Sequence, residues 1–187
     1  LGAGEGGRSV IAAPYDAREL GGLLGQLRHP MRETTFMGMT IQAFDPMLDG
    51  GSPAWDQPFG RVAKVPLETL LRTSDVVSLH VPLTEGTRRM IDASALGSMQ
   101  PPAILINAAR GGVVDEAALA EALKAGRIGG AALDVFETEP LKAEEASRFA
   151  GAPNLILTPH IAGLSAEATV RVSQVTVDSV RRHLTGE

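Results

Sequence analysis

The amino-acid sequence of 187 residues predicts an α/β fold, a doubly wound parallel sheet with flanking helices. From Met39 onward, short β-type runs alternate with stretches of helical pattern, which is typical of such a sheet. Three of the apolar runs lead to polar residues of different kinds, Arg110, Glu139 and His160. Ligands bind beyond the carboxyl ends of the strands in open α/β sheets. We therefore expect a guanidinium, a carboxylate and an imidazole to line one crevice.

The individual elements follow from local patterns. Strands are expected where short apolar runs are bounded by turn residues, at residues 40–44, 61–65, 76–79, 104–107, 130–133 and 155–157. Four helices are expected, each starting at a proline or a capping side chain: 66–72 from Pro66, 93–99 after Asp92, 116–125 after Asp115 and 166–183 after Ser165. Residues 46–60 are rich in Pro and Gly and are expected to form a loop.

Composition excludes several classes of protein. A net charge of −5 and a pI near 5.4 argue against binding to nucleic acid or to an anionic membrane. No apolar run approaches the roughly 20 residues of a membrane helix, and the first residues lack a signal-peptide pattern. The absence of cysteine excludes disulfides and is compatible with a reducing cytoplasm, where we expect this protein. Four scattered histidines without close ligand spacing predict no metal site.

Asp45 follows an expected strand, where a carboxylate can accept hydrogen bonds from both ribose hydroxyls of a dinucleotide. It would also repel a 2′-phosphate, and no arginine follows it, so NAD would be preferred over NADP. The alternative is an Asx turn, because Pro46 comes next. From the residues alone the two interpretations are equally supported.

Arg110 precedes two glycines, in a turn that lets a ligand approach the backbone closely. Its guanidinium can bind a carboxylate through two hydrogen bonds, or it can simply cover a strand end. His160 and Glu139 make sense as a pair, because a carboxylate orients an imidazole for general acid catalysis. The alternative is a structural histidine in a Pro-His turn. His80 also ends a strand and is expected to shape the cofactor wall.

Two glycine-rich segments were considered for the cofactor phosphates. Gly2, Gly4 and Gly7 match G-x-G-x-x-G, but no strand precedes them and Asp45 lies too far downstream. The segment from Gly22 to Gly25 lacks the third glycine of the motif. Neither is expected to bind pyrophosphate in the usual way.

Several longer segments resemble the D-isomer-specific 2-hydroxyacid dehydrogenases. They occur in the family's order and spacing: residues 38–46 (GMTIQAFDP), 74–84 (SDVVSLHVPLT), 106–116 (INAARGGVVDE), 132–140 (ALDVFETEP) and 157–163 (LTPHIAG). The resemblance implies a Rossmann-like fold, NAD as cofactor, and reversible reduction of a small 2-oxo acid by NADH. It implies that Arg110 anchors the substrate carboxylate and that Glu139 holds His160, the proton donor. Residues implied to line the cofactor are Asp45, Val81, Pro82, Thr84, Ala108, Ala109, Arg110, Asp134, His160, Ala162 and Gly163.

The sequence also departs from the family pattern. Residues 38–187 are expected to form the NAD-binding domain with its C-terminal helix, and residues 1–37 an irregular segment. In that segment, residues 9–14 would be a strand and residues 17–27 a helix, together a remnant of the substrate domain. Because most of that domain is missing from the sequence, the alternative is a truncated, non-catalytic binding or dimerisation module. The family's cofactor domains commonly pair, so a homodimer is expected in either case.

Overall fold

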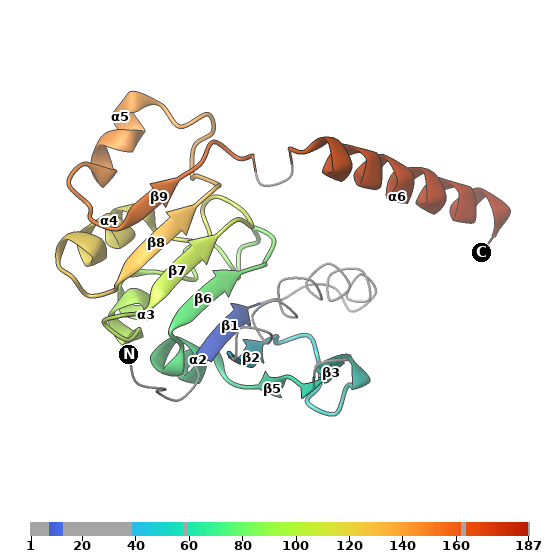
Figure 1. Cartoon of the computed structure of the whole chain (residues 1–187), viewed down its shortest axis with the longest axis horizontal. Helices are drawn as coiled ribbons and strands as arrows, with labels where there is room; N and C mark the ends of the chain where they lie inside the picture. The colour runs from blue at the N-terminus through green and yellow to red at the C-terminus, as the bar shows by residue number, and fades with distance from the viewer. Residues whose placement is uncertain (1–7, 13–38, 58–59, 162–163, 187) are drawn as a thin grey trace.

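The computed structural model describes residues 8–12, 39–57, 60–161 and 164–186. Its centre is a seven-stranded parallel sheet in the order β5-β2-β1-β6-β7-β8-β9 (Figure 1). The strands are β1 Arg8–Ala12, β2 Thr40–Phe44, β5 Ala63–Lys64, β6 Val76–Leu79, β7 Ile104–Asn107, β8 Gly130–Leu133 and β9 Leu155–Leu157. The strand order reverses between β1 and β6, and in such sheets that switch point opens the ligand crevice. The predicted doubly wound fold is confirmed.

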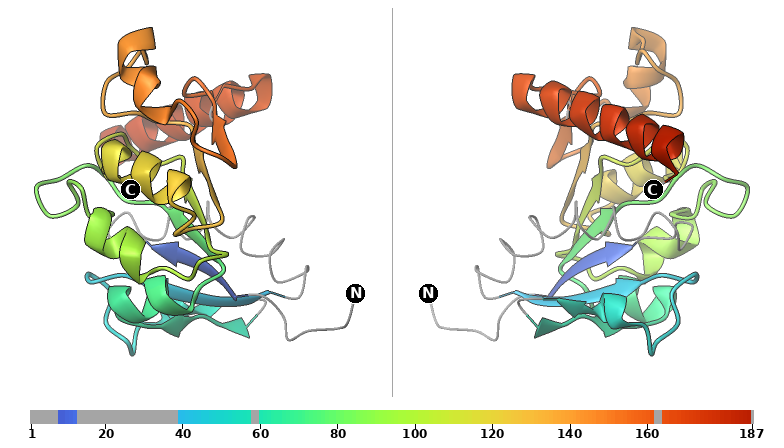
Figure 2. Two further views of the ribbon diagram at one scale, coloured as in Figure 1. Left: turned by 90° about the vertical axis from the view of Figure 1, so that its left-hand side faces the viewer. Right: turned by 90° about the vertical axis from the view of Figure 1, so that its right-hand side faces the viewer.

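Three helices cover one face of the sheet (Figure 2): α2 Leu67–Thr73, α3 Ala93–Ser98 and α4 Glu116–Lys124. Leucines from both layers, among them Leu79, Leu105 and Leu119, are fully buried and form the core between them. The predicted caps are present, because Asp92 and Asp115 accept hydrogen bonds from the backbone N–H groups of the first helical turns. Pro66 differs from the prediction, since it is the N-cap of α2 rather than part of its first turn.

The expected place of the first strand is wrong. Arg8–Ala12 pairs in parallel with β2 on one side and with β6 on the other, in the middle of the sheet. It therefore belongs to the dinucleotide-binding unit and not to a remnant of a substrate domain. Residues 9–14 have strand character, but the sequence does not show which strands they join, because that pairing is non-local. The rest of the expected segment, including the helix at 17–27 and both glycine-rich stretches, lies outside the described residues.

Residues 46–60 are more ordered than the loop that composition predicts. They contain the 3-10 helix η1 Pro53–Trp55 and strand β3 Asp56–Gln57, which pairs with β4 Gly60–Arg61 as a small hairpin. Trp55 is buried, and its indole N–H donates to the carbonyl of Asp49 at 2.7 Å. The expected strand at 61–65 is consequently split between β4 and β5. The helix α5 Ala143–Ala146 and the 3-10 helix η2 Ser147–Phe149 were not predicted.

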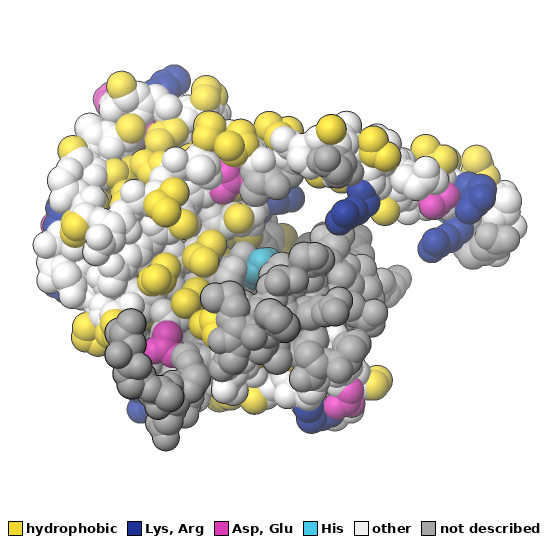
Figure 3. All heavy atoms as spheres, viewed as in Figure 1, with side chains coloured by type: hydrophobic (Ala, Val, Ile, Leu, Met, Phe, Trp, Pro, Cys, Tyr) yellow, Lys and Arg dark blue, Asp and Glu magenta, His cyan; other side chains and the backbone are white. Residues whose placement is uncertain are grey.

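The last helix, α6 Ala166–Thr185, extends away from the sheet (Figure 1). Its predicted cap Ser165 accepts from the backbone N–H of Ala168 at 3.0 Å. Valines along this helix are exposed, with Val170 at 70% and Val180 at 54%, and apolar side chains run along the helix in Figure 3. Even so, no helix in the described ranges is long and apolar enough to cross a bilayer.

Candidate active site

The pairing register places the carboxyl ends of four strands next to one another. Leu79, Asn107, Leu133 and Leu157 lie side by side across β6, β7, β8 and β9. The next residue of each strand therefore lies in one row along the carboxyl edge of the sheet: His80, Ala108, Asp134 and Thr158. This row is where the sequence placed the crevice.

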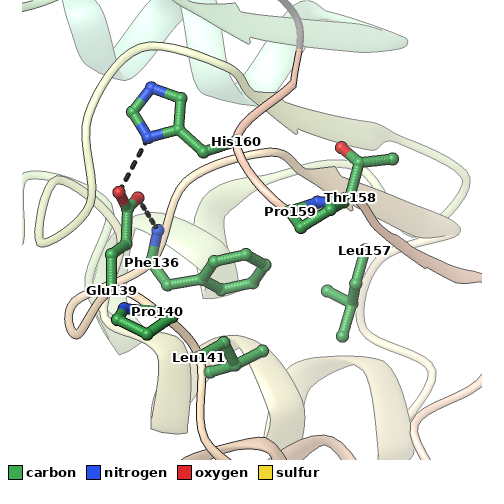
Figure 4. A pocket seen from close by; sticks show the side chains of 8 residues that line it. All are labelled: Phe136, Glu139, Pro140, Leu141, Leu157, Thr158, Pro159 and His160. Atoms are coloured by element: carbon green, nitrogen blue, oxygen red, sulfur yellow. Dashed lines mark hydrogen bonds and ion pairs between the residues drawn. The ribbon is translucent and has the colours of Figure 1, made fainter.

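His160 and Glu139 meet at this edge. The imidazole Nδ1 lies 2.7 Å from Glu139 Oε2, and Glu139 Oε1 accepts from the backbone N–H of Phe136 at 3.0 Å (Figure 4). The hydrogen bond from His160 and, next, that from Phe136 lower the pKa of the Glu139 carboxyl, since both favour its charged form. His160 has a φ of 54°, a left-handed conformation that non-glycine residues rarely adopt and that recurs at functional sites.

The pair borders a surface pocket of about 560 Å³. It is formed by the segment after β8 and the segment after β9, with the lining residues Phe136, Glu139, Pro140, Leu141, Leu157, Thr158, Pro159 and His160 (Figure 4). The side chain of His160 is 51% exposed and that of Glu139 is 35% exposed. The His160–Glu139 pair is therefore open to solvent in this chain.

Asp134 fixes the turn that carries His160. Its Oδ1 accepts from the hydroxyl of Thr158 at 2.5 Å and from the backbone N–H of Ile161 at 2.9 Å. Asp134 is itself 7% exposed at the end of β8. The turn after β9 is thus tied to the neighbouring strand on both sides of the histidine.

Arg110 is presented by a turn that Asn107 holds closed. The side chain of Asn107 accepts from the N–H of Ala109 at 3.1 Å and donates to the carbonyl of Arg110 at 3.0 Å. The exposed guanidinium donates to the carbonyl of Ala109 at 2.6 Å, and no described hydrogen bond joins it to His160 or Glu139. The structure therefore unites two of the three predicted catalytic side chains and leaves the third on its own turn.

Asp45 forms the Asx turn with one carboxylate oxygen and leaves the other without a partner. Its Oδ1 accepts from the N–H of Met47 at 2.8 Å, the Asx turn, and from that of Leu48 at 3.3 Å. Its Oδ2 is buried and has no partner in the described part of the chain. Burial raises the pKa of this carboxyl, and a buried oxygen without a hydrogen bond is costly. A ribose hydroxyl would supply the missing donor, so this position fits a dinucleotide.

The other predicted cofactor residues follow β6 and β7. Val81 is buried, Pro82 is half-buried, and the Thr84 backbone N–H donates to the hydroxyl of Thr87 at 2.8 Å. Ala108 is exposed at the edge, whereas Ala109 is largely buried. The predicted Ala162 and Gly163 lie outside the described residues.

Sequence reasoning missed the role of Glu116. It treated this residue as the first residue of a helix, where acidic residues are usually solvated. The structure buries its carboxylate under the segment after β8, in contact with Arg148 and the backbone of Glu137. A second acid directly after the capping Asp115 is the only signal of it in the sequence.

Comparisons with known proteins point to one family. The sequence model described as "D-isomer specific 2-hydroxyacid dehydrogenase, NAD binding domain" matches residues 28–162. The chain is 50% identical over 163 residues to the (S)-sulfolactate dehydrogenase of Chromohalobacter salexigens, covering 87% of this chain and 51% of that protein. It is 46% identical over 151 residues to the glycerate dehydrogenase of Methylorubrum extorquens, covering 81% and 44%.

Solved structures are similar as well. An NAD complex of a D-isomer specific 2-hydroxyacid dehydrogenase from Lactobacillus delbrueckii ssp. bulgaricus superposes with a TM-score of 0.72 and 26% identity, over 95% of this chain and 54% of that one. The chain thus spans about half the length of the relatives it matches. Sequence and fold lead to the same conclusion: the chain belongs to the D-isomer specific 2-hydroxyacid dehydrogenase family and represents its NAD-binding domain.

Proposed function

We propose that this chain supplies the cofactor and acid-base half of an oxidoreductase that interconverts a 2-hydroxy acid and a 2-oxo acid. The observation that carries the proposal is the hydrogen bond between His160 and Glu139 at the carboxyl edge of the sheet. Because Glu139 occupies Nδ1, the Nε2 atom of the imidazole remains for the substrate. In the direction of reduction, Nε2 donates a proton to the carbonyl oxygen of the 2-oxo acid. In the opposite direction it removes the hydroxyl proton.

NAD, when bound in its reduced form, supplies the hydride that the carbonyl carbon accepts. The residues proposed to hold it are Asp45 at a ribose, Asp134 beside the carboxamide, and the strand-end residues Val81, Pro82, Thr84, Ala108, Ala109, Ala162 and Gly163. The unpartnered, buried Oδ2 of Asp45 supports the ribose contact. Arg110 would anchor the substrate carboxylate, since an exposed guanidinium can exchange its bond to Ala109 for two charged hydrogen bonds.

The substrate class is a small, polar 2-hydroxy acid. The relatives named for sulfolactate, glycerate and hydroxypyruvate support this class. A cytoplasmic location and a homodimer are also part of the proposal, and exposed apolar side chains such as Ile156 on the edge strand β9 support self-association. Light scattering of the purified chain would measure its oligomeric state.

A second candidate is a binding or dimerisation module without activity. One fact favours it: residues 13–18 after β1 contain no glycine where the phosphate loop of this fold is expected. The two candidates differ in whether the chain binds NADH and catalyses the reduction of a 2-oxo acid.

The test is a titration of the 187-residue chain with NADH, followed by assays with sulfopyruvate, hydroxypyruvate, glyoxylate and pyruvate. The proposal expects saturable binding and NADH consumption with at least one acid. His160→Ala should lower turnover about 100 to 10,000-fold, as expected for loss of a general acid. His183→Ala, an exposed histidine on α6, is the matched control and should leave it unchanged. No NADH binding up to millimolar concentration would favour the module without activity.

A further inference from the structure

Glu116 is a charged side chain in an unusual place. It is the first residue of α4, and its side chain is 3% exposed. The helix does not need it as a cap, because Asp115 Oδ1 already accepts from the N–H of Ala118 at 3.0 Å. Burial raises the pKa of the Glu116 carboxyl, so its charge is held there at a cost.

The partners of Glu116 explain how that cost is offset. Its Oε2 accepts from the guanidinium of Arg148 at 3.1 Å, and its Oε1 accepts from the backbone N–H of Glu137. The same guanidinium lies 3.4 Å from the Glu137 carboxylate. A buried carboxylate with two such donors holds them firmly, because charged hydrogen bonds are the stronger kind. One of the two donors is the backbone of the segment that carries Glu139.

That segment, residues 136–139, is fixed at consecutive amides. The N–H of Phe136 donates to Glu139 Oε1, and the next N–H, of Glu137, donates to Glu116. The carbonyl of Phe136 packs directly on Gly111, where an added Cβ would lie 1.7 Å from its oxygen. Glu116 thus holds this segment against the turn of Arg110. In that position the side chain of Glu139 reaches His160.

We propose that Glu116 is a positioning residue for the Glu139–His160 pair, acting through the Glu137 amide and the segment 136–139. The inference rests on the proposed function only in taking that pair to be the acid-base pair of the reaction. The positioning itself is a property of the folded chain, with or without activity.

The experiment is an NMR titration of the Glu139 side-chain carboxyl in the 187-residue chain and in its Glu116→Gln variant. Gln has nearly the same shape, but its single amide oxygen is a weaker acceptor and forms no ion pair with Arg148. The groups that act on Glu139 are the imidazole of His160, the N–H of Phe136 and the carboxylate of Asp134. If the segment loosens, Glu139 loses the two hydrogen bonds, and its pKa rises toward the ordinary value.

The direction of the change separates positioning from simple electrostatics. Removing a negative charge from Glu116 would by itself lower the pKa of Glu139, because like charges disfavour ionisation. Positioning predicts a rise. It also predicts that the Glu137 amide exchanges with solvent about tenfold faster, the effect of about 1.4 kcal/mol lost from one charged hydrogen bond.

The matched control is Glu121→Gln, which removes an exposed carboxylate of the same helix that pairs with Lys124 at 3.2 Å. This variant should change neither the pKa of Glu139 nor the rate at which the Glu137 amide exchanges with solvent. A Glu139 pKa that stays or falls in a folded Glu116→Gln chain would overturn the proposal, as would an equal rise in Glu121→Gln. These measurements do not depend on enzyme activity. If the chain fails to bind NADH, the proposed function is disproved, but the positioning of Glu139 by Glu116 is still tested.

Discussion

Two histidines at the carboxyl edge of the sheet lie in opposite environments. His160 is half-exposed and paired with Glu139, whereas His80 is partly buried with its ring 2.8 Å from the hydroxyl of Ser78. Burial lowers the pKa of His80 to about 4, because the charged imidazole would lose its hydration. His80 is therefore neutral near pH 7, which suits a wall of the crevice better than proton transfer.

This difference predicts a pH dependence of stability. An unfolded chain protonates His80 near pH 6.5, but the folded chain does so only near pH 4, so acid favours unfolding between these values. One pKa unit is worth about 1.4 kcal/mol, and the loss should reach about 3 kcal/mol at the acid end of this window. His80→Gln should remove most of that slope in urea unfolding measured from pH 7 to 4. An unchanged slope, or an equal change in the exposed His183→Gln, would contradict the assignment.

At the scale of elements, the contact between the Arg110 turn and the segment after β8 tolerates no side chain. A Cβ at Gly111 would lie 1.7 Å from the Phe136 oxygen, a backbone atom that cannot move without displacing Glu139. Gly111→Ala should therefore lower the free energy of unfolding by about 1–3 kcal/mol or more, the usual cost of overpacking. It should also reverse the lowering of the Glu139 pKa.

Gly97→Ala is the control for this substitution. Gly97 lies in α3, and nothing is within 4 Å of an added Cβ. Alanine there should stabilise the chain by about 0.4–1 kcal/mol, because it restricts the unfolded state. Guanidinium unfolding of both variants checks the pair. Equal effects would mean that the Gly111 contact is not rigid.

The helix α6 should contribute little to the stability of the sheet. Nearly all of its described residues are exposed, and it projects from the body of the molecule (Figure 1). Removing residues 164–187 should shift the Tm by no more than about 2 °C, the range of a surface change in a chain of this size. Leu119→Ala, in the core under α4, should by contrast cost about 2–5 kcal/mol. A large loss of Tm on truncation would show that α6 packs against the sheet in solution.

At the scale of the whole molecule, the open site would limit the rate of the proposed reaction. The exposure of His160 and Glu139 leaves water beside the reacting atoms, whereas electrostatic stabilisation of a transition state is strongest in a dry site. We predict that kcat of this chain is at least about 100-fold below that of the Chromohalobacter salexigens relative, which is about twice as long. Side-by-side assays of NADH oxidation measure the ratio. Comparable rates would mean that the pocket closes in solution.

The local parts of this fold could be predicted because their signals are local. The strands at 40–44, 76–79 and 104–107 and the caps at Asp92, Asp115 and Ser165 match the structure, since apolar runs and capping side chains act within a few residues. The hairpin within residues 46–60 was missed because Pro and Gly indicate turns but not how their flanks pair.

The sequence by itself determined the alternation of strands and helices, the candidate residues at the strand ends, and the family. Only the tertiary structure decided that Arg8–Ala12 lies between β2 and β6, that Glu116 is buried against Arg148, and that His160 meets Glu139. Each of these depends on contacts between residues far apart in the chain. Periodicity in the sequence shows which face of an element is buried, but not which element packs against it.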